Sequence, residues 1–389
     1  MNMQVAATSG TARPIGYFVH HQGRGHAQRC AAIVNALPIS QKATIFCART
    51  DIFPPLRAGI HIEKIPSLFE PTGFEDVNDT FGQPETVHCA PLGWPGIRSA
   101  MGIMANWFHQ ANPALMIVDV SAEVAQLARL CSVPCVKILQ HGDRSDIGHR
   151  AAYAGCVGLI APCARALAQD DWNDLMAKIH FAAGIGTAQP RADKRTARAA
   201  LDLPKNKQVV LVISGGGGNG FGSAPLGVGA RATPDKFWVT VGKVETEWHA
   251  TEPANLRHDG WVDTIRDYIA AADTIVASTG NTTCHDIMAA GRPWIAVPEW
   301  RYFDEQVEKA NALGRIGAAH VVPAMPSSAH GWRKAIALAH DTHDPAVQRS
   351  LIDPDAPRKL ADWLARMIAA LTPPTAAAQD RALTPEISI

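Results

Sequence analysis

Residues 278–293 read STGNTTCHDIMAAGRP, and they decide the fold of this chain. The apolar run Thr274–Ala277 precedes them, and a second run, Trp294–Val297, follows them. Short apolar runs bounded by turn residues predict buried strands, and the segment between these two is long enough for a helix. Gly291 is suited to end that helix. We therefore predict a strand, a turn of small residues, a helix and a second strand.

The turn before this helix predicts a binding site for an anion. The start of a helix leaves backbone N–H groups without partners and carries the positive end of the helix dipole, which suits a phosphate. Asp286 lies one turn into the helix, where its carboxylate is placed to accept a hydrogen bond from a sugar hydroxyl. A nucleotide sugar presents both groups together, so the pattern favours this class of ligand.

Short apolar runs alternate with helical patterns along the rest of the chain, which is typical of parallel βα units. We predict two Rossmann-like, doubly wound α/β domains in tandem, with a ligand cleft between them at the carboxyl ends of the strands. Helices are predicted at 26–37 and 122–130. The predicted strands are 15–19, 43–47, 61–65, 115–119, 135–139, 157–161, 208–213, 236–241, 273–277, 294–297 and 318–321.

The glycine-containing segment 184–190 is the predicted hinge, and it gives an N-terminal domain of residues 1–186 and a C-terminal domain of residues 187–350. Residues 351–371 predict a helix with one apolar face that packs back across the domains. Residues 372–389 are rich in Pro and Ala and are expected to be disordered. The irregular insertion 67–95 has the length and composition of a binding loop.

The composition excludes several classes of protein. The 389 residues contain 36 basic and 36 acidic side chains, so no net field favours nucleic acid or an anionic membrane. No apolar run approaches the ~20 residues of a transmembrane helix. The first thirteen residues lack the features of a signal peptide. The eight cysteines form no CxxC pair, which favours reduced thiols in the cytoplasm over a structural zinc site.

A histidine at the start of the second predicted element is the candidate general base. Gly23 and Gly25 permit a tight turn after the first strand, and His26 then opens a helix whose dipole keeps the imidazole neutral. Asp119 ends another strand at the same sheet edge and is the candidate for orienting His26. Two structural alternatives stay open. His26 could cap its helix or be a buried structural residue, and Asp119 could be the N-cap of the helix that begins near residue 122.

Other histidines near this edge have weaker positional arguments. His20 and His21 are interpreted as loop residues. His141 follows the next strand and reaches the same cleft edge, where it is placed to line an acceptor pocket. A simple loop role for His141 stays open.

A second glycine loop, residues 214–222, follows the strand 208–213 and contains Gly215, Gly216 and Gly217. A loop of this kind after a buried strand favours contact with phosphate or substrate over a solvent linker. The spacing formally satisfies GxGxxG, but residues 224–227 do not continue as a helix, so NAD binding is disfavoured. A Walker-type ATPase is disfavoured because no GxxxxGK[ST] is present.

Together these landmarks resemble the GT-B glycosyltransferases, and in particular the lipid-intermediate N-acetylglucosaminyltransferases of peptidoglycan synthesis and the UDP-dependent transferases of small molecules. The resemblance covers most of the chain in the order of its elements. Its motifs are concentrated between residues 261 and 312. They are Trp261-Val262-Asp263, Ser278-Thr279-Gly280-Asn281, Asp286, Ala290-Gly291-Arg292-Pro293, Pro298, Asp304-Glu305-Gln306 and Asn311-Ala312.

The resemblance implies a role for each matching residue. Val262 would meet the nucleotide base through its backbone, and Asp286 would bind the ribose. Glu305 and Gln306 would contact hydroxyls of the donor sugar. In such enzymes a histidine in the position of His26 serves as the base, with an aspartate where Asp119 stands. The residues implied around the diphosphate are Ser278, Thr279, Gly280, Asn281 and Thr282.

The chain departs from the pattern in two places. The usual acid of the family is Glu, but here it is the shorter Asp286. The spacing before the Glu305-Gln306 pair is lengthened by residues 300–303. Residues 23–29 also resemble the GxGHxxR motif of nucleotide-sugar hydrolases that share this fold.

The expected function is transfer of a sugar from a UDP-sugar to a hydroxyl acceptor, with inversion and without a metal or other cofactor, since the helix dipole can stabilise the charge of the leaving diphosphate. The acceptor is expected to be lipid-linked, a polysaccharide or a small molecule, as in cell-envelope synthesis at the inner face of the membrane. No nucleic-acid partner is expected. A UDP-sugar hydrolase, an epimerase of the same fold and a non-catalytic nucleotide-sugar-binding subunit stay open as alternatives.

Overall fold

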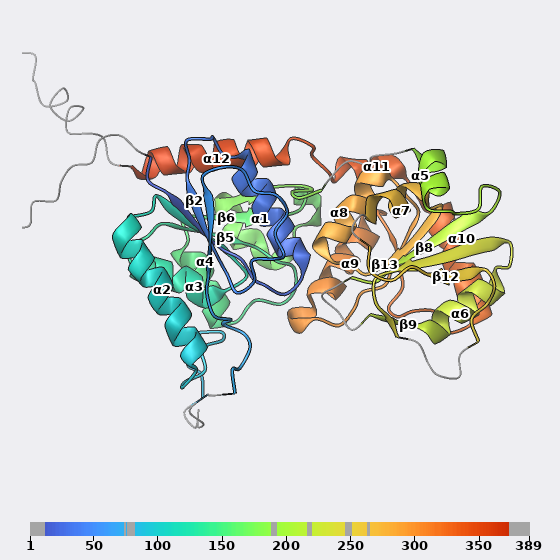
Figure 1. Cartoon of the computed structure of the whole chain (residues 1–389), viewed down its shortest axis with the longest axis horizontal. Helices are drawn as coiled ribbons and strands as arrows, with labels where there is room; N and C mark the ends of the chain where they lie inside the picture. The colour runs from blue at the N-terminus through green and yellow to red at the C-terminus, as the bar shows by residue number, and fades with distance from the viewer. Residues whose placement is uncertain are drawn as a thin grey trace, which may run out of the picture.

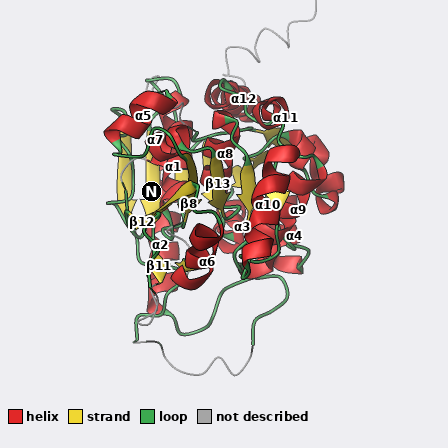
Figure 2. Ribbon diagram, turned by 90° about the vertical axis from the view of Figure 1, so that its right-hand side faces the viewer, coloured by secondary structure: helices red, strands yellow, loops and turns green. Residues whose placement is uncertain are grey.

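The computed structural model describes residues 12–73, 75, 82–187, 193–215, 220–245, 251–262 and 265–372. Two α/β domains lie side by side, each built on one sheet (Figure 1). Helices flank the sheets on both faces (Figure 2). The predicted fold class is therefore confirmed.

The first domain contains a seven-stranded sheet in the order β3-β2-β1-β4-β5-β6-β7, and all its strand pairs are parallel. The order reverses between β1 and β4, which is where ligands bind in doubly wound sheets. The strands are β1 (Ile15–Phe18), β2 (Ala43–Cys47), β3 (Ile60–Lys64), β4 (Leu115–Asp119), β5 (Cys135–Ile138), β6 (Gly158–Ala161) and β7 (Ile179–Phe181).

The second domain repeats this topology with the six-stranded parallel order β12-β10-β8-β13-β14-β15. A small parallel pair, β9 and β11, lies beside it. Its switch point falls between β8 and β13. The strands are β8 (Gln208–Ile213), β9 (Phe221–Gly222), β10 (Lys236–Val241), β11 (Val244–Glu245), β12 (Leu256–His258), β13 (Thr274–Ala277), β14 (Trp294–Ala296) and β15 (His320–Val321).

Helices join most of these strands, as right-handed parallel connections require. In the first domain they are α1 (Arg24–Ala36), α2 (Pro95–Ala111), α3 (Ala122–Leu130), α4 (Ile147–Gly155) and the 3₁₀ segments η1 (Arg165–Leu167) and η2 (Asp170–Lys178). In the rest of the chain they are α5 (Lys194–Ala200), α6 (Ser223–Ala232), α7 (Ile265–Ala271), α8 (Asn281–Ala290), η3 (Tyr302–Asp304), α9 (Glu305–Arg315), α10 (Ala329–Asp341), α11 (Pro345–Ser350) and α12 (Ala356–Leu371).

The central strands are buried along their whole length. Every residue of β1, β4, β5 and β13 is buried. Strands covered on both faces by helices carry continuous apolar runs, which is why these strands were readable from the sequence.

The last helix, α12, returns from the second domain to the first and packs against α1 (Figure 1). Leu360 and Leu364 are fully buried in the core beside β1. Trp363 stacks on His180, with ring centroids 5.1 Å apart. Among the described residues, no helix is long and apolar enough to cross a membrane.

Two expectations about single elements were wrong. Residues 224–227 are part of a helix, α6, because Pro225 lies in the first turn, where a missing N–H costs nothing. The short strands β7, β9, β11 and β12 were not predicted, because two or three residues are too few to show a pattern. The tail 373–389 lies outside the described residues, as do Gly216, Gly217 and Asp263.

Candidate functional site

The predicted anion site lies at the start of α8. β13 ends at Ala277, and Gly280 is the N-cap residue of α8. Within the described part of the chain, no side chain caps this end of the helix, and a Cβ added to Gly280 would meet no atom within 4 Å. Gly291 ends the helix in the left-handed conformation. The first turn of α8 therefore presents uncapped N–H groups beside open space.

Gln306 holds the turn that precedes α8. Its Oε1 accepts hydrogen bonds from the backbone N–H groups of Thr279, at 3.2 Å, and Glu299, at 2.8 Å. Thr279 Oγ1 donates to the backbone oxygen of Gln306 at 2.7 Å. Both donors of Thr279 are thus used inside the protein, and Gln306 Oε1 positions the turn. The expected contacts of Thr279 with a diphosphate and of Gln306 with a sugar stay predictions.

Lys309 places a cation at the same helix end. It lies one helical turn after Gln306 on α9, and its Nζ donates to Asn281 Oδ1 at 2.7 Å. Asn281 Nδ2 in turn donates to the carbonyl oxygen of Pro162 in the first domain, at 3.4 Å. The lysine is 4% exposed, and no carboxylate of the described residues forms an ion pair with it. Lys309 was not predicted, although its spacing of three from Gln306 puts both residues on one face of the helix.

The first glycine loop faces this helix end across the domain boundary. A Cβ added to Gly25 would lie only 2.8 Å from Thr282 Oγ1, so the bare glycine lets α8 approach α1. Gly23 is the N-cap of α1 with φ of 82°, a conformation that favours glycine. Arg24 lies over the Trp261 ring, with its guanidinium carbon 5.5 Å from the ring centroid. The two predicted loops are thus neighbours.

His26 and Asp119 meet at this boundary, together with an arginine that the sequence analysis did not assign. His26 Nδ1 lies 3.2 Å from Asp119 Oδ1. Arg29 Nη2 and Nε donate to the Asp119 carboxylate at distances of 2.7 to 3.1 Å. Asp119 is fully buried, and the His26 side chain is 22% exposed. Arg29 stands three residues after His26 in α1, a spacing that could have identified it.

The charge state of Asp119 follows from these contacts. Burial alone would raise the pKa of its carboxyl, but the adjacent Arg29 guanidinium and His26 hold that pKa below its ordinary value. Asp119 is therefore ionised at neutral pH. It does not cap α3, because the Ser121 side chain accepts from the Val124 N–H as the N-cap of that helix.

The protonation of His26 is constrained from two sides. The contact with Asp119 requires a proton on Nδ1. Arg29 Nη2 also lies 2.9 Å from Nδ1, and a hydrogen bond there would require a lone pair on the same atom. Because Arg29 already donates to Asp119, we assign the proton to Nδ1, which leaves a lone pair on Nε2. In this tautomer the ring can accept a proton.

His20 packs beside His26, with ring centroids 5.6 Å apart, and stacks on Phe69 at 4.4 Å. Burial and the neighbouring His26 lower the pKa of His20 to about 3, so it stays neutral. His20 and Phe69 thus form one wall around the His26 ring. Phe69 belongs to the insertion 67–95, whose described part contains no helix or strand before α2 begins at Pro95.

His141, which was predicted to line an acceptor pocket, is buried in the first domain. Its ring is 3% exposed, its Nε2 lies 2.7 Å from the Leu167 carbonyl oxygen, and it packs on Trp172 at 5.1 Å. Burial lowers the pKa of His141 to about 3. The side chain is thus buried and hydrogen-bonded inside the protein, which favours the structural role that the sequence left open.

The remaining predicted donor residues lie around the ends of β8, β13 and β12. A Cβ on Gly215 would meet no described atom within 4 Å, whereas one on Gly242 would lie 1.9 Å from the Ser214 carbonyl oxygen. The ends of β8 and β10 are therefore packed tightly against each other. Val262 is half-buried, and so is Asp286, in the second turn of α8. Their assigned contacts with base and ribose stay predictions.

No family model matches the chain. Two curated relatives carry the name UDP-N-acetylglucosamine--N-acetylmuramyl-(pentapeptide) pyrophosphoryl-undecaprenol N-acetylglucosamine transferase. The one from Salinibacter ruber is 30% identical over 33% of this chain and 37% of its own length. The one from Serratia proteamaculans is 28% identical over 72% of this chain and 78% of its own length. The chain thus spans little more than a third of the first relative.

Solved structures show the same fold. A UDP-glucosyltransferase from Polygonum tinctorium superposes with a TM-score of 0.66 and 11% identity, covering 93% of this chain and all of that one. Acinetobacter baumannii MurG superposes with a TM-score of 0.57 and 13% identity, covering 91% of this chain and all of that one. The chain has the GT-B fold, and the resemblance to GT-B glycosyltransferases is confirmed. The expected class of enzyme agrees with these names.

Proposed function

We propose that the chain transfers a sugar from a UDP-sugar to a hydroxyl group of an acceptor. One observation carries the proposal: the uncapped start of α8 lies against the loop that holds His26, and His26 is in contact with an ionised carboxylate. One side of the boundary is suited to an anionic leaving group. The other side is suited to removing a proton.

In the proposed reaction, His26 Nε2 takes the proton of the acceptor hydroxyl while its oxygen attacks the anomeric carbon. A new C–O bond forms, and the bond from that carbon to the diphosphate breaks. The electron pair leaves with UDP. Attack from the face opposite the diphosphate inverts the anomeric configuration. Asp119 stabilises the imidazolium that forms.

The leaving diphosphate would be stabilised by fixed groups. The N–H groups at the start of α8 and the Lys309 ammonium are already in place, so little reorganisation is needed as negative charge develops. This supports a reaction that needs no metal ion, and the assay should proceed in the presence of a chelator. The names of the curated relatives make UDP-N-acetylglucosamine the first donor to test, with a lipid-linked or polysaccharide acceptor.

The proposal is tested by replacing His26. The His26→Ala variant should bind UDP as wild type does but turn over ~10²–10⁴-fold more slowly, the usual loss for a general base. UDP affinity is measured by calorimetry and turnover by UDP release with an acceptor panel. Wild-type turnover in this variant would remove His26 from the mechanism. The matched control is His109→Ala, in the last turn of α2.

A UDP-sugar hydrolase is the second candidate, because Arg29 of the GxGHxxR motif contacts both Asp119 and His26. In that case His26 would activate water in place of a sugar hydroxyl. Incubation with a UDP-sugar and no acceptor separates the two functions. Rapid stoichiometric release of free sugar supports hydrolysis, whereas release only with an acceptor supports transfer.

A further inference from the structure

The segment that lengthens the chain before Glu305 has an unusual backbone. Phe303 and Asp304 have φ of 64° and 53°, in the left-handed region that side chains other than glycine rarely adopt. Trp300 and Tyr302 of the same segment are 71% and 73% exposed. Conformations of this kind persist only where the surroundings enforce them. The contacts of Phe303 with the first domain hold the backbone in this conformation.

Phe303 belongs to the second domain, but its ring is held by the first. His88 and His149 approach it edge-on, with centroid distances of 5.0 and 5.4 Å. The Arg144 guanidinium carbon lies 4.6 Å from its centroid. The Phe303 carbonyl oxygen also accepts from the Asp143 N–H at 2.8 Å. We call His88, His149 and Arg144 the socket of Phe303.

Gly142 makes this approach sterically possible. A Cβ at this position would lie 2.3 Å from the Phe303 carbonyl oxygen. Its φ of 103° also favours glycine. The socket is thus matched to the backbone of the inserted segment as well as to its aromatic ring.

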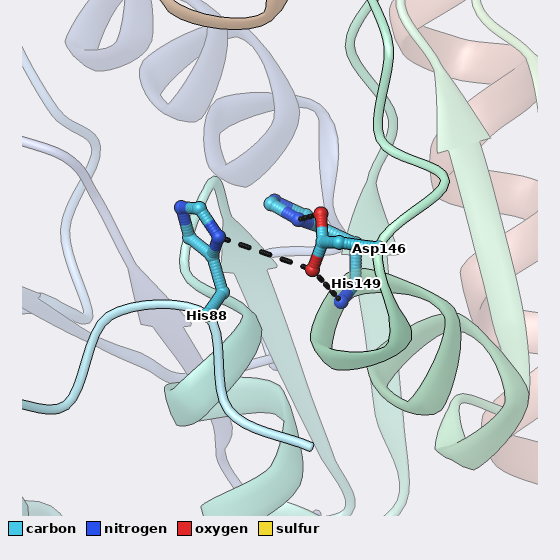
Figure 3. A group of neighbouring side chains, drawn as sticks. All are labelled: His88, Asp146 and His149. Carbon is cyan, nitrogen blue, oxygen red and sulfur yellow. Dashed lines mark hydrogen bonds and ion pairs between the residues drawn. The ribbon is translucent and has the colours of Figure 1, made fainter. Parts of the chain in front are cut away.

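The socket is held by hydrogen bonds around Asp146 (Figure 3). His149 Nδ1 lies 2.6 Å from Asp146 Oδ2, and His88 Nδ1 lies 3.9 Å from Asp146 Oδ1. Their donor atoms are close enough together for a cation. However, Arg144 Nη1 lies 3.4 Å from His149 Nε2, so Nε2 accepts and Nδ1 carries the proton. A metal would have to displace that proton beside a guanidinium, so we assign a hydrogen-bonded support.

Arg144 joins this socket to the donor-sugar position. Its Nη2 lies 3.5 Å from Glu305 Oε2, across the domain boundary. The arginine side chain is 7% exposed and that of Glu305 is 26% exposed, so the pair is only partly screened by solvent. Glu305 is the residue expected to contact hydroxyls of the donor sugar, and its orientation depends on an arginine of the other domain.

We propose that Phe303 and its socket form an interdomain clasp, and that Arg144 is a positioning residue that orients Glu305 toward the donor sugar only when the domains are closed. Recognition of the sugar is thereby linked to closure, whereas recognition of the nucleotide is not. The assignment of Glu305 rests on the proposed function. The clasp itself rests only on the contacts of Phe303.

The positioning role is tested by comparing UDP with UDP-N-acetylglucosamine in calorimetry. Arg144→Met should leave UDP affinity within about twofold of wild type and weaken the UDP-sugar by about tenfold, as expected when one charge-assisted contact is lost. The control is Arg150→Met, which removes an arginine of α4 that is paired with Asp174 of the same domain. This variant should change neither the affinity for UDP nor the affinity for UDP-N-acetylglucosamine. Equal weakening of both ligands, or of neither, would overturn the positioning role.

The clasp is tested without any ligand. Phe303→Ala should increase the radius of gyration in small-angle scattering, while its melting temperature shows that it stays folded. If the variant does not fold, Phe303→Leu, which keeps apolar volume but loses the ring contacts, takes its place. An unchanged radius would overturn the clasp. If wild type binds no UDP-sugar, the proposed function fails, and the scattering result still decides on the clasp.

Discussion

Arg29 lies between the two residues assigned to proton transfer. It neutralises part of the charge of Asp119, and it places a second positive group 2.9 Å from His26 Nδ1. Arg29 therefore shares the Asp119 carboxylate with His26 and fixes the orientation in which that carboxylate meets His26 Nδ1.

The Arg29→Met variant tests this shared contact. Without the guanidinium, the buried Asp119 carboxyl loses the neighbour that most lowers its pKa, so the pKa of Asp119 should rise. The acidic limb of the rate profile should then move to higher pH, and the ¹⁵N shifts of His26 should report the same change. A profile and shifts identical to wild type would contradict this influence of Arg29 on Asp119. Arg165→Met, in η1, is the matched control.

Lys309 makes a different prediction at the residue scale. A buried ammonium beside the positive end of a helix is unfavourable until an anion arrives. Lys309→Met should therefore raise the melting temperature of the free protein and weaken UDP binding by about tenfold. Lys334→Met, on the exposed face of α10, should do neither. Lower stability together with unchanged UDP affinity would show that Lys309 is only structural.

At the scale of elements, the site depends on how closely α1 and α8 approach each other. Gly25→Ala suits the helix α1 by propensity, yet its Cβ would lie 2.8 Å from Thr282 Oγ1. We expect this variant to keep its melting temperature and to lose turnover because the two helix ends move apart.

The Thr282→Ala change removes that oxygen and leaves the next atom at 3.9 Å, so the double variant should recover part of the lost turnover. Gly102→Ala in α2, where a Cβ meets no described atom within 4 Å, serves as the control. Additive effects of the Gly25 and Thr282 substitutions would argue against the close approach. Turnover is measured by UDP release in all variants.

The elements that could be predicted are those with long buried runs. α8 was predicted because β13 and β14 bracket it and Gly291 ends it, all signals local in the sequence. α6 was missed because glycine and proline hide its pattern, and its packing against α10 overrides their weak propensity. Local sequence thus predicts the topology well.

The site was predictable only where one residue's role follows from its place at a strand end. His26 and Asp119 meet as expected. His141 occupies an equivalent position in the sequence, but its ring turns inward to the Leu167 carbonyl, a contact between residues far apart in the chain. The clasp of Phe303 depends on the packing of two domains, and no local pattern indicates it.

At the scale of the whole molecule, several buried histidines link stability to pH. Burial lowers the pKa of His141 and of His285 to about 3, well below the ordinary value of 6.5. Between these values the unfolded chain takes up protons and the folded chain does not. Stability should therefore fall as pH drops below about 6.5, by about 1.4 kcal/mol per pH unit for each group.

Scanning calorimetry at pH 7, 6 and 5 measures this loss. His141→Gln keeps a donor toward Leu167 but cannot titrate, so between pH 6.5 and 5 it should lose about 2 kcal/mol less than wild type. The variant is compared with itself across pH, so its lower starting stability does not affect the result. If the free energy of unfolding falls with pH equally in both proteins, protonation of His141 does not destabilise the fold.

The chain crosses between its domains twice, once after the first domain's last strand and once before α12, and the two crossings touch. The Asp353 N–H donates to the Ala183 carbonyl at 3.0 Å, and a Cβ on Gly184 would lie 3.0 Å from an Ile352 side-chain carbon. Because the two connecting segments contact each other, the domains can rotate about this contact but cannot separate. If the backbone is cleaved in either segment, the other segment should still join the domains, but the axis of rotation should no longer be fixed.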